Sequence, residues 1–232
     1  MKRFYRTARV EPIDGGFTVA LDGKPVRTPA KAPLVVASRA LAAAIAAEWQ
    51  AQAGEVRPNA LPLTRLASTA LDLVAPRHAE IVAGIAKYAG TDLVCYRAAH
   101  PPELAERQAR AWQPLIDWVA VRYDAPLEVT AGVVPLPQPE ASLAALAACV
   151  TAYDAMTLTA LHLATAACGS LVLALALHER RIDAETAFAL SQLDESYEIE
   201  QWGEDAEQTQ RRAALRDDIL LAARFLALLR EA

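Results

Sequence analysis

The sequence predicts an α+β fold, in which a small N-terminal antiparallel β-rich domain is followed by a larger all-α helical domain. Short alternating segments separated by Asp-Gly turns fill the first part, whereas beyond Pro58 the apolar residues recur every three to four positions. Alanine accounts for 52 of the 232 residues, and alanine has the highest helix propensity. We therefore expect two domains, at residues 1–58 and 59–232.

Turn signals delimit the predicted strands, which lie at residues 9–11, 17–21, 25–28 and 33–37. The Asp-Gly pair at 22–23 lies between two alternating segments, a strong signal for a β-hairpin. Ser38 is the expected N-cap of a first helix over 39–53. We expect Glu48 and Gln52 of this helix to be solvated.

Helical periodicity predicts seven further segments, at residues 64–74, 77–88, 102–122, 139–153, 154–177, 183–202 and 205–229. Prolines lie between these segments or at their starts, where the missing N–H is tolerated. Residues 127–134 are an exception because they alternate like a strand. One interpretation is that this strand joins the N-terminal sheet and makes the domain boundary discontinuous.

Composition excludes several classes of protein. A net charge of −5 removes the uniformly basic surface that nucleic-acid binders need, so we expect no nucleic-acid partner. Residues 155–178 carry no charge and are long enough to cross a bilayer, but their threonines, alanines and histidines indicate a buried helix. We therefore expect no membrane insertion. Three cysteines without shared spacing, and no secretory signal at the N-terminus, predict a cytoplasmic protein.

No catalytic motif is visible. The four histidines are far apart and form no metal-binding pair; they are His78, His100, His162 and His178. Residues 168–170 lack the nucleophile elbow of a hydrolase, and the glycines form no phosphate-binding loop. The sequence therefore predicts no catalytic residues, no metal ion and no cofactor, which weighs against an enzyme.

A concentration of acidic residues is the most unusual feature. Residues 183–207, the acidic stretch, contain nine Asp and Glu and no Lys or Arg, whereas residues 1–31 carry seven basic and three acidic side chains. If a helix continues to Trp202, side chains at three-to-four spacing lie along one stripe of it. They are Asp194, Glu198, Gln201, Trp202 and Asp205. Gly203 offers a helix stop, and Asp205 is placed to cap the next helix.

Three interpretations of the acidic stretch stay open. It is a surface that binds a partner protein, with Trp202 as an anchor. Alternatively it is a solvated face or is paired internally, for example with Arg65 or Arg97, and is then structural. The third interpretation is a small-ligand enzyme that uses an acidic pocket around Glu195 and Glu198.

Several motifs occur together and in order along the chain. They are Arg3-Phe4-Tyr5, LDGKPVRTP at 21–29, AAEWQAQ at 46–52, PLTRL at 62–66, TDLVCYR at 91–97, DESY at 194–197 and QWGED at 201–205. In these motifs the sequence resembles the chaperone family that assembles the F(1) sector of ATP synthase by acting on its alpha subunit. The resemblance runs from the first residues to about the last helix.

This resemblance implies a non-enzymatic assembly factor that binds the unassembled alpha subunit and prevents its aggregation until the beta subunit pairs with it. It also implies a small β domain followed by a helical domain. Carried over residue by residue, the partner-binding site is expected at Glu195, Glu198, Gln201, Trp202, Gly203 and Glu204. The family often has Gln at position 198. We expect a monomeric bacterial protein; the resemblance places eukaryotic relatives in the mitochondrial matrix.

Overall fold

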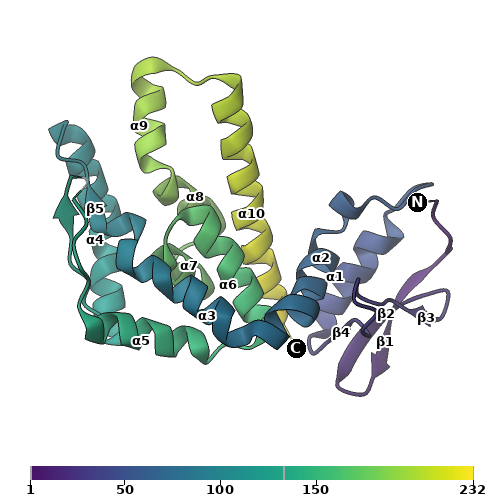
Figure 1. Ribbon diagram of the computed structural model, residues 1–232. Helices are drawn as coiled ribbons and strands as arrows, with labels where there is room; N and C mark the ends of the chain where they lie inside the picture. The colour runs from purple at the N-terminus through teal and green to yellow at the C-terminus, as the bar shows by residue number, and fades with distance from the viewer. Residues whose placement is uncertain (1, 133, 232) are drawn as a thin grey trace. The chain divides into compact units, whose positions relative to one another are not determined.

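The computed structural model describes residues 2–132 and 134–231. The chain divides into two compact units (Figure 1). Unit 1 consists of Met1–His78, Asp154–Ala160 and Arg224–Ala232, and unit 2 consists of Ala79–Tyr153 and Leu161–Ala223. A sheet of antiparallel strands near the N-terminus is followed by a mostly helical remainder, which confirms the predicted α+β class.

The sheet of unit 1 is built around its second strand. Its strands are β1 (Ala8–Ile13), β2 (Gly16–Leu21), β3 (Lys24–Pro25) and β4 (Val35–Val36). β2 pairs antiparallel with each of the other three, and the predicted hairpin turn at 22–23 is confirmed. Gly16 has a φ of +147°, and a Cβ added there would lie 2.4 Å from the carbonyl oxygen of Val36. The close approach of β4 to β2 therefore requires glycine at this position.

Helix α1 (Arg39–Gln50) packs against β1 and β2 (Figure 1). Ser38 is its N-cap, as predicted, because the Ser38 hydroxyl oxygen accepts a hydrogen bond from the Leu41 N–H at 3.1 Å. The same hydroxyl donates to the carbonyl of Leu228, at the far end of the chain. Leu41 and Ile45 are fully buried on the face of α1 that forms the core of unit 1.

The rest of the first segment of unit 1 is helical, with η1 (Pro58–Ala60), α2 (Pro62–Thr69), a π-helical turn η2 (Ala70–Val74) and η3 (Ala75–Arg77). Glu48 caps α2: its carboxylate accepts from the N–H of Leu63 at 2.7 Å and from the N–H of Thr64 at 3.0 Å. The N-cap residue of α2 makes no side-chain hydrogen bond, so Glu48 satisfies these N–H groups from another helix.

Glu48 and Gln52 are therefore not solvated, contrary to the prediction. Glu48 is half-buried, and Gln52 is only 6% exposed. The Gln52 amide accepts from the Arg57 N–H at 2.9 Å and donates to the carbonyl of Glu48 at 3.1 Å. Both side chains supply hydrogen bonds to backbone that no regular element satisfies.

The remaining elements are α3 (His78–Ala86), η4 (Lys87–Thr91), η5 (Leu93–Cys95), β5 (Tyr96–Arg97), α4 (Pro102–Tyr123), β6 (Thr130–Ala131), α5 (Glu140–Thr151), α6 (Ala155–Cys168), α7 (Leu171–His178), α8 (Ala184–Ser191), α9 (Leu193–Trp202) and α10 (Ala206–Arg230). Every residue of α7 from Leu171 to Leu177 is buried, as predicted for the uncharged segment. Among the described residues, no helix has both the length and the apolar character that crossing a membrane requires.

Two of the predicted helices are each interrupted. The segment 154–177 breaks at Gly169, which has a φ of +64°, and Ser170 then caps α7 by accepting from the Leu173 N–H at 3.0 Å. The segment 183–202 breaks at Gln192, with φ −115° and ψ 25°. Apolar periodicity continues across both breaks, so it predicted one helix where the structure has two.

The strand at 127–134 pairs elsewhere than with the N-terminal sheet. Thr130–Ala131 forms β6, which runs parallel to β5 in unit 2. The interpretation that this segment extends the N-terminal sheet is therefore wrong for these two residues, and residue 133 lies outside the described part of the chain. Unit 1 takes in 59–78 as well, so its limits differ from the predicted domain boundary at residue 58, which stays a prediction.

The buried side chain of Asp92 connects two helical elements of unit 2. Its side chain is fully buried and accepts from the N–H of Val94 at 3.3 Å and from the N–H of Val172 at 3.0 Å. It therefore joins the start of η5 to the start of α7. Burial raises the pKa of the Asp92 carboxyl to about 6, despite the hydrogen bonds that favour its charged form.

Candidate partner-binding site at the turn between α9 and α10

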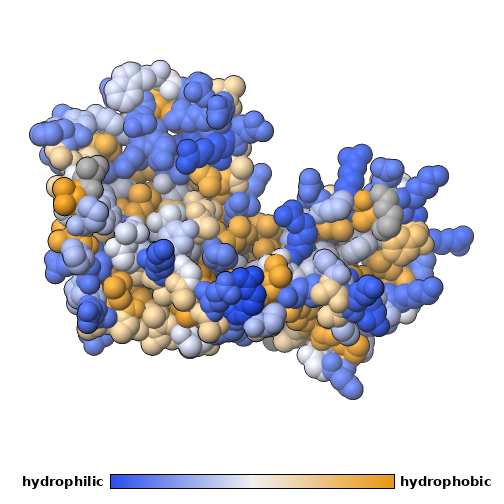
Figure 2. All heavy atoms as spheres, viewed as in Figure 1, coloured by the Kyte–Doolittle hydropathy of each residue, from blue (hydrophilic) through white to orange (hydrophobic). Residues whose placement is uncertain are grey.

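The candidate site lies where α9 gives way to α10. Helix α9 ends at Trp202, and Gly203 follows with a φ of +84°, a backbone conformation that glycine adopts at low cost. Asp205 then caps α10 by accepting from the Gln208 N–H at 2.8 Å. The predicted stop at Gly203 and cap at Asp205 are both confirmed. Figure 2 shows hydrophilic residues gathered over this tip.

The structure places all six predicted site residues on α9 or on this turn, namely Glu195, Glu198, Gln201, Trp202, Gly203 and Glu204. Glu195 is half-buried and the other five residues are exposed. Trp202 is 78% exposed, which is unusual for the largest apolar side chain. Glu195, Glu198 and Trp202 are three and four positions apart, so they share one stripe of α9.

Part of the acidic stretch is used to hold α9 in place. The Gln108 amide of α4 donates to the Asp194 carboxylate at 2.7 Å, near the start of α9. Arg107, also from α4, pairs with Glu200 at 2.7 Å, and its guanidinium lies 5.2 Å from the centre of the Tyr197 ring. These contacts fix α9 against α4 from its first turn to its last.

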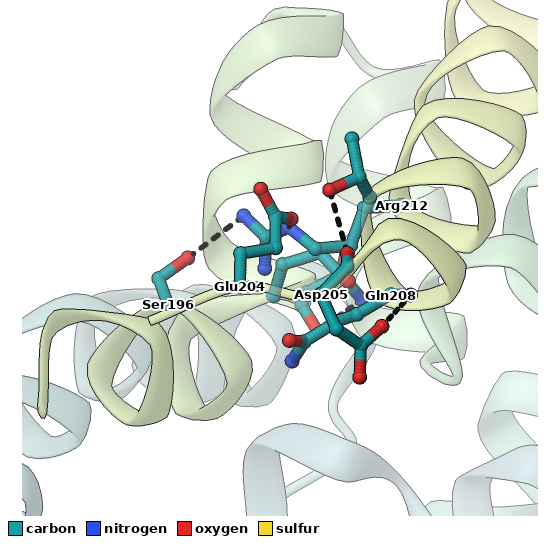
Figure 3. A network of polar contacts seen from close by, with 8 residues as sticks. Ser196, Glu204, Asp205, Gln208 and Arg212 are labelled. Carbon is teal, nitrogen blue, oxygen red and sulfur yellow. Dashed lines mark hydrogen bonds and ion pairs between the residues drawn. The ribbon is translucent and has the colours of Figure 1, made fainter. Parts of the chain in front are cut away.

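Arg212 holds the turn itself. Its Nε lies 3.4 Å from the Glu204 carboxylate, and its Nη2 donates to the Ser196 hydroxyl at 3.1 Å (Figure 3). The Arg212 side chain is only 17% exposed, and its guanidinium lies 5.5 Å from the centre of the Phe188 ring. Glu204 therefore makes an ion pair within the protein, unlike Glu195 and Glu198.

Internal pairing accounts for six of the nine acids in the acidic stretch. Asp183 and Asp205 cap helices, whereas Glu185, Asp194, Glu200 and Glu204 contact side chains of Arg216, Gln108, Arg107 and Arg212 respectively. The structural interpretation is correct for these six, and the four side-chain partners come from α4 and α10. Arg97 instead donates to the backbone carbonyl of Val94.

Two acids of the predicted site have no such role. Across the part of the chain that the structure describes, neither Glu195 nor Glu198 has a hydrogen-bond or ion-pair partner, and the same holds for Glu207. We call Glu195, Glu198 and Trp202 the α9 patch. It combines two unpaired carboxylates with an exposed indole on a helix that is anchored at both ends.

The positions of these carboxylates differ from those expected for an acidic ligand pocket. Glu198 is exposed and Glu195 is half-buried, so the two do not lie in a closed acidic pocket. Within residues 2–132 and 134–231, no group of three or more His, Cys, Asp or Glu side chains is arranged to hold a metal ion. Exposed carboxylates on a helix surface are suited to contacting a basic protein surface.

Sequence reasoning missed the residues that position the α9 patch. Arg107 and Gln108 lie more than 80 positions before their partners in α9, and no local pattern marks them. Gln108 is nevertheless only 1% exposed, and a glutamine among the apolar positions of α4 is the one available signal.

Comparison with known proteins identifies the family. Residues 2–120 match the family model described as ATP12 chaperone protein. The crystal structure of Atp12 from Paracoccus denitrificans is 44% identical, with a TM-score of 0.96 over 99% of this chain and 98% of that chain. The Atu1473 protein from Agrobacterium tumefaciens is 43% identical, with a TM-score of 0.91 over 98% of this chain and 85% of its own.

A more distant relative is the mitochondrial protein atp12 of Schizosaccharomyces pombe, which is 24% identical over 224 residues, or 89% of this chain and 76% of that protein. The family model ends before α9, whereas the likeness to the Paracoccus structure includes α9 and α10. The family model covers more than half of the sequence, and the Paracoccus structure is similar over nearly all of it. Both comparisons indicate the same family. This chain therefore belongs to the ATP12 chaperone family.

Proposed function

We propose that this protein is an assembly chaperone that binds the unassembled alpha subunit of the ATP synthase F(1) sector and prevents its aggregation until the beta subunit pairs with it. Membership of the ATP12 chaperone family supports this proposal. The observation that carries it to particular residues is the α9 patch, where Glu195 and Glu198 are unpaired beside an exposed Trp202.

A subunit that has not yet met its neighbour exposes apolar and charged surface that aggregates. A chaperone has to cover that surface and later release it. Charge pairs at the rim of an interface accelerate encounter, and an aromatic anchor supplies affinity at its centre. The α9 patch has both parts, so we propose that it meets basic residues of the alpha subunit around an apolar contact made by Trp202.

Gln201, Gly203 and Glu204 have a supporting role in this proposal. Gly203 turns the chain after Trp202, and the ion pair of Glu204 with Arg212 holds the turn. We also propose that the protein acts as a monomer, without catalytic activity, in a bacterial cytoplasm. Relatives from two bacteria, with 44% and 43% identity, support this setting.

The test is capture of the alpha subunit from the organism's own cytosol, together with light scattering of isolated alpha subunit as it is warmed. We expect the wild-type chain to enrich alpha without beta and to suppress scattering. Glu195→Gln with Glu198→Gln should weaken capture about tenfold at low salt, with a smaller difference at high salt because surface charges are screened. Trp202→Ala should weaken capture at all salt concentrations.

A matched control is available on α4. Glu103 and Glu106 have the same three-residue spacing, are exposed, and have no side-chain partner among the described residues. Glu103→Gln with Glu106→Gln should leave capture unchanged. Equal capture by the wild type and the Glu195/Glu198 variant would remove the α9 patch from the proposal, and enrichment of no alpha subunit by the wild type would overturn the proposed client.

A further inference from the structure

Unit 1 contains a pocket of about 640 Å³ that takes no part in the candidate site. All of its lining residues belong to unit 1, from the turn after β3, the end of α1, and the surface of α2 and η2. A volume of this size is in the range of pockets that bind ligands, roughly 300–1,000 Å³.

The walls of the pocket are mostly apolar. Trp49 of α1 lines the pocket together with Val56, Pro58 and Leu61. Leu73 also lines it and is 51% exposed, although it is a large apolar residue. An exposed leucine next to a mostly apolar hollow is the arrangement expected where an apolar side chain of another molecule is inserted.

Some polar groups of the pocket have hydrogen-bond partners within the protein, and others do not. The Asp72 carboxylate accepts from the Ala30 N–H at 2.9 Å, and the Thr64 hydroxyl donates to Glu48 at 2.8 Å. The Trp49 Nε1 is buried and has no hydrogen-bond partner in the described chain. The Arg65 guanidinium is exposed and likewise has no partner there.

The Arg65 guanidinium can only donate hydrogen bonds, so it favours a carboxylate or a carbonyl of a ligand. The hydroxyls of Ser68 and Thr69, which also line the pocket, can donate or accept. The Trp49 Nε1 has almost no accessible surface, so a ligand in the pocket contacts other atoms of the indole ring.

The net charge of unit 1 favours an anionic ligand. Unit 1 contains 13 Lys and Arg against 8 Asp and Glu, a formal charge of +5, whereas unit 2 contains 10 against 20, a formal charge of −10. Arg27 also lines the pocket as a second cation, and its guanidinium donates to the carbonyl of Lys31 at 2.8 Å. The field of unit 1 therefore attracts negatively charged segments, and the α9 patch attracts positively charged ones.

We propose that this pocket is a second protein-binding site, which takes a short acidic-apolar peptide segment of a partner protein. A bulky apolar side chain of the segment packs against Trp49 and Leu73, and a neighbouring Asp or Glu pairs with Arg65. The pocket favours acidic segments, whereas the α9 patch favours basic ones. The proposed site therefore does not depend on the α9 patch or on the identity of the client.

The test uses fluorescein-labelled ten-residue peptides and the full chain, with binding followed by polarisation. The first peptide carries one Phe flanked by two Glu. The second replaces both Glu with Lys, and the third replaces Phe with Ser. N-acetylphenylalanine, which has the aromatic ring and one carboxylate, serves as an unlabelled small-molecule competitor.

We expect the Phe/Glu peptide to bind at least tenfold more tightly than either altered peptide. Arg65→Gln should weaken its binding about fivefold, and Leu73→Ala, which removes exposed apolar surface from the pocket, should weaken it severalfold. The matched control is Arg39→Gln, because Arg39 is an exposed arginine of unit 1 that lies outside the pocket and has no partner among the described residues. It should bind the peptide like the wild type.

Thermal unfolding of each variant identifies any loss of fold, and Arg65→Gln keeps the proposal testable if Leu73→Ala unfolds. Equal binding of the Glu and Lys peptides, or equal loss in Arg65→Gln and Arg39→Gln, would overturn the proposal. Competition by N-acetylphenylalanine at the affinity of the whole peptide would overturn it in favour of a small-molecule site. Because no alpha subunit is used, these results are separate from the test of the proposed function.

Discussion

Gln108 of α4 donates a hydrogen bond of 2.7 Å to Asp194 at the start of α9, although Gln108 is only 1% exposed. The other end of the same amide accepts from the Ala98 N–H at 2.6 Å. One buried side chain thus connects β5 and its following loop to the helix that carries the α9 patch. Anchoring at this point determines which residues of α9 face outward.

Replacing Gln108 should loosen α9. Gln108→Ala leaves the Ala98 N–H and the Asp194 carboxylate without their partner, which should lower the free energy of unfolding by about 1–3 kcal/mol. Urea denaturation followed by circular dichroism measures this. Gln113→Ala is the control, because Gln113 lies on the same helix but is exposed. A loss of similar size in both variants would contradict the proposed anchoring.

Glu204 should contribute less to client capture than Glu195 and Glu198. It is already paired with Arg212, so its charge is partly neutralised before a client arrives. We expect Glu204→Gln to weaken alpha-subunit capture about twofold, against about tenfold for the double Glu195/Glu198 variant. Loss of the pair itself should cost at most about 1 kcal/mol of stability, because it is partly exposed.

Side-by-side capture at 50 mM and 300 mM salt compares the three glutamates. If Glu204→Gln proved as harmful as the double variant while its unfolding free energy stayed unchanged, Glu204 would have to contact the client directly. Arg212→Gln separates the two roles, because it leaves the Glu204 charge in place and removes only the pairing.

Asp92 should make the protein less stable as the pH rises from about 4 to about 6. Its folded pKa is about 6, above its ordinary value of 3.8, so the folded state holds a proton that the unfolded state releases. Stability from the neutral carboxyl is complete below the unfolded pKa and is lost as the pH passes the folded pKa. A shift of this size corresponds to a decline on the order of 2–3 kcal/mol.

Urea titrations at pH 4, 5, 6 and 7 on the wild type and on Asp92→Asn measure this decline. The variant cannot ionise at residue 92, so the difference in its pH dependence from the wild type isolates this group. The neighbouring thiols of Cys95 and Cys168 stay protonated throughout, because burial raises the pKa of each to about 12. Parallel pH profiles for the two proteins would refute a raised pKa for Asp92.

Gly16→Ala should destabilise unit 1 more than Gly23→Ala. Both glycines have a positive φ, so each substitution carries backbone strain of about 1 kcal/mol. Only at Gly16 does the new Cβ meet the backbone of β4, whereas at Gly23 it meets open space. Thermal unfolding should show a clearly larger loss for Gly16→Ala, and equal losses would place β4 further from β2.

The sequence was enough to predict the turns and helix caps, because these depend on residues that are close together in the chain. The hairpin at 22–23, the cap at Ser38, the stop at Gly203 and the cap at Asp205 all lie where the sequence predicts them. Each depends on a backbone conformation or a hydrogen bond within a few residues, which the residue types themselves specify.

Long-range contacts were not predictable from the pattern. Glu48 caps a helix that begins 14 residues later, and nothing in its own helix distinguishes it from a solvated glutamate. The breaks at Gly169 and Gln192 are hidden because the buried faces on either side continue the same apolar spacing. β5 and β6 have two residues each and pair across more than 30 positions. For the candidate site, the pattern placed the acids on a helix that ends at Trp202, but it could not separate paired from unpaired acids.

The contact between Ser38 and Leu228 has a consequence for synthesis. Unit 1 is completed by three stretches of chain, and the last of them begins at Arg224. On the ribosome, the hydroxyl that caps α1 therefore waits for its carbonyl acceptor until residue 228 has been translated, 190 positions later. The N-terminal β-strands emerge first, but the last stretch of unit 1 emerges only after all of unit 2. A chaperone of this design therefore completes its first unit only after its second has been translated.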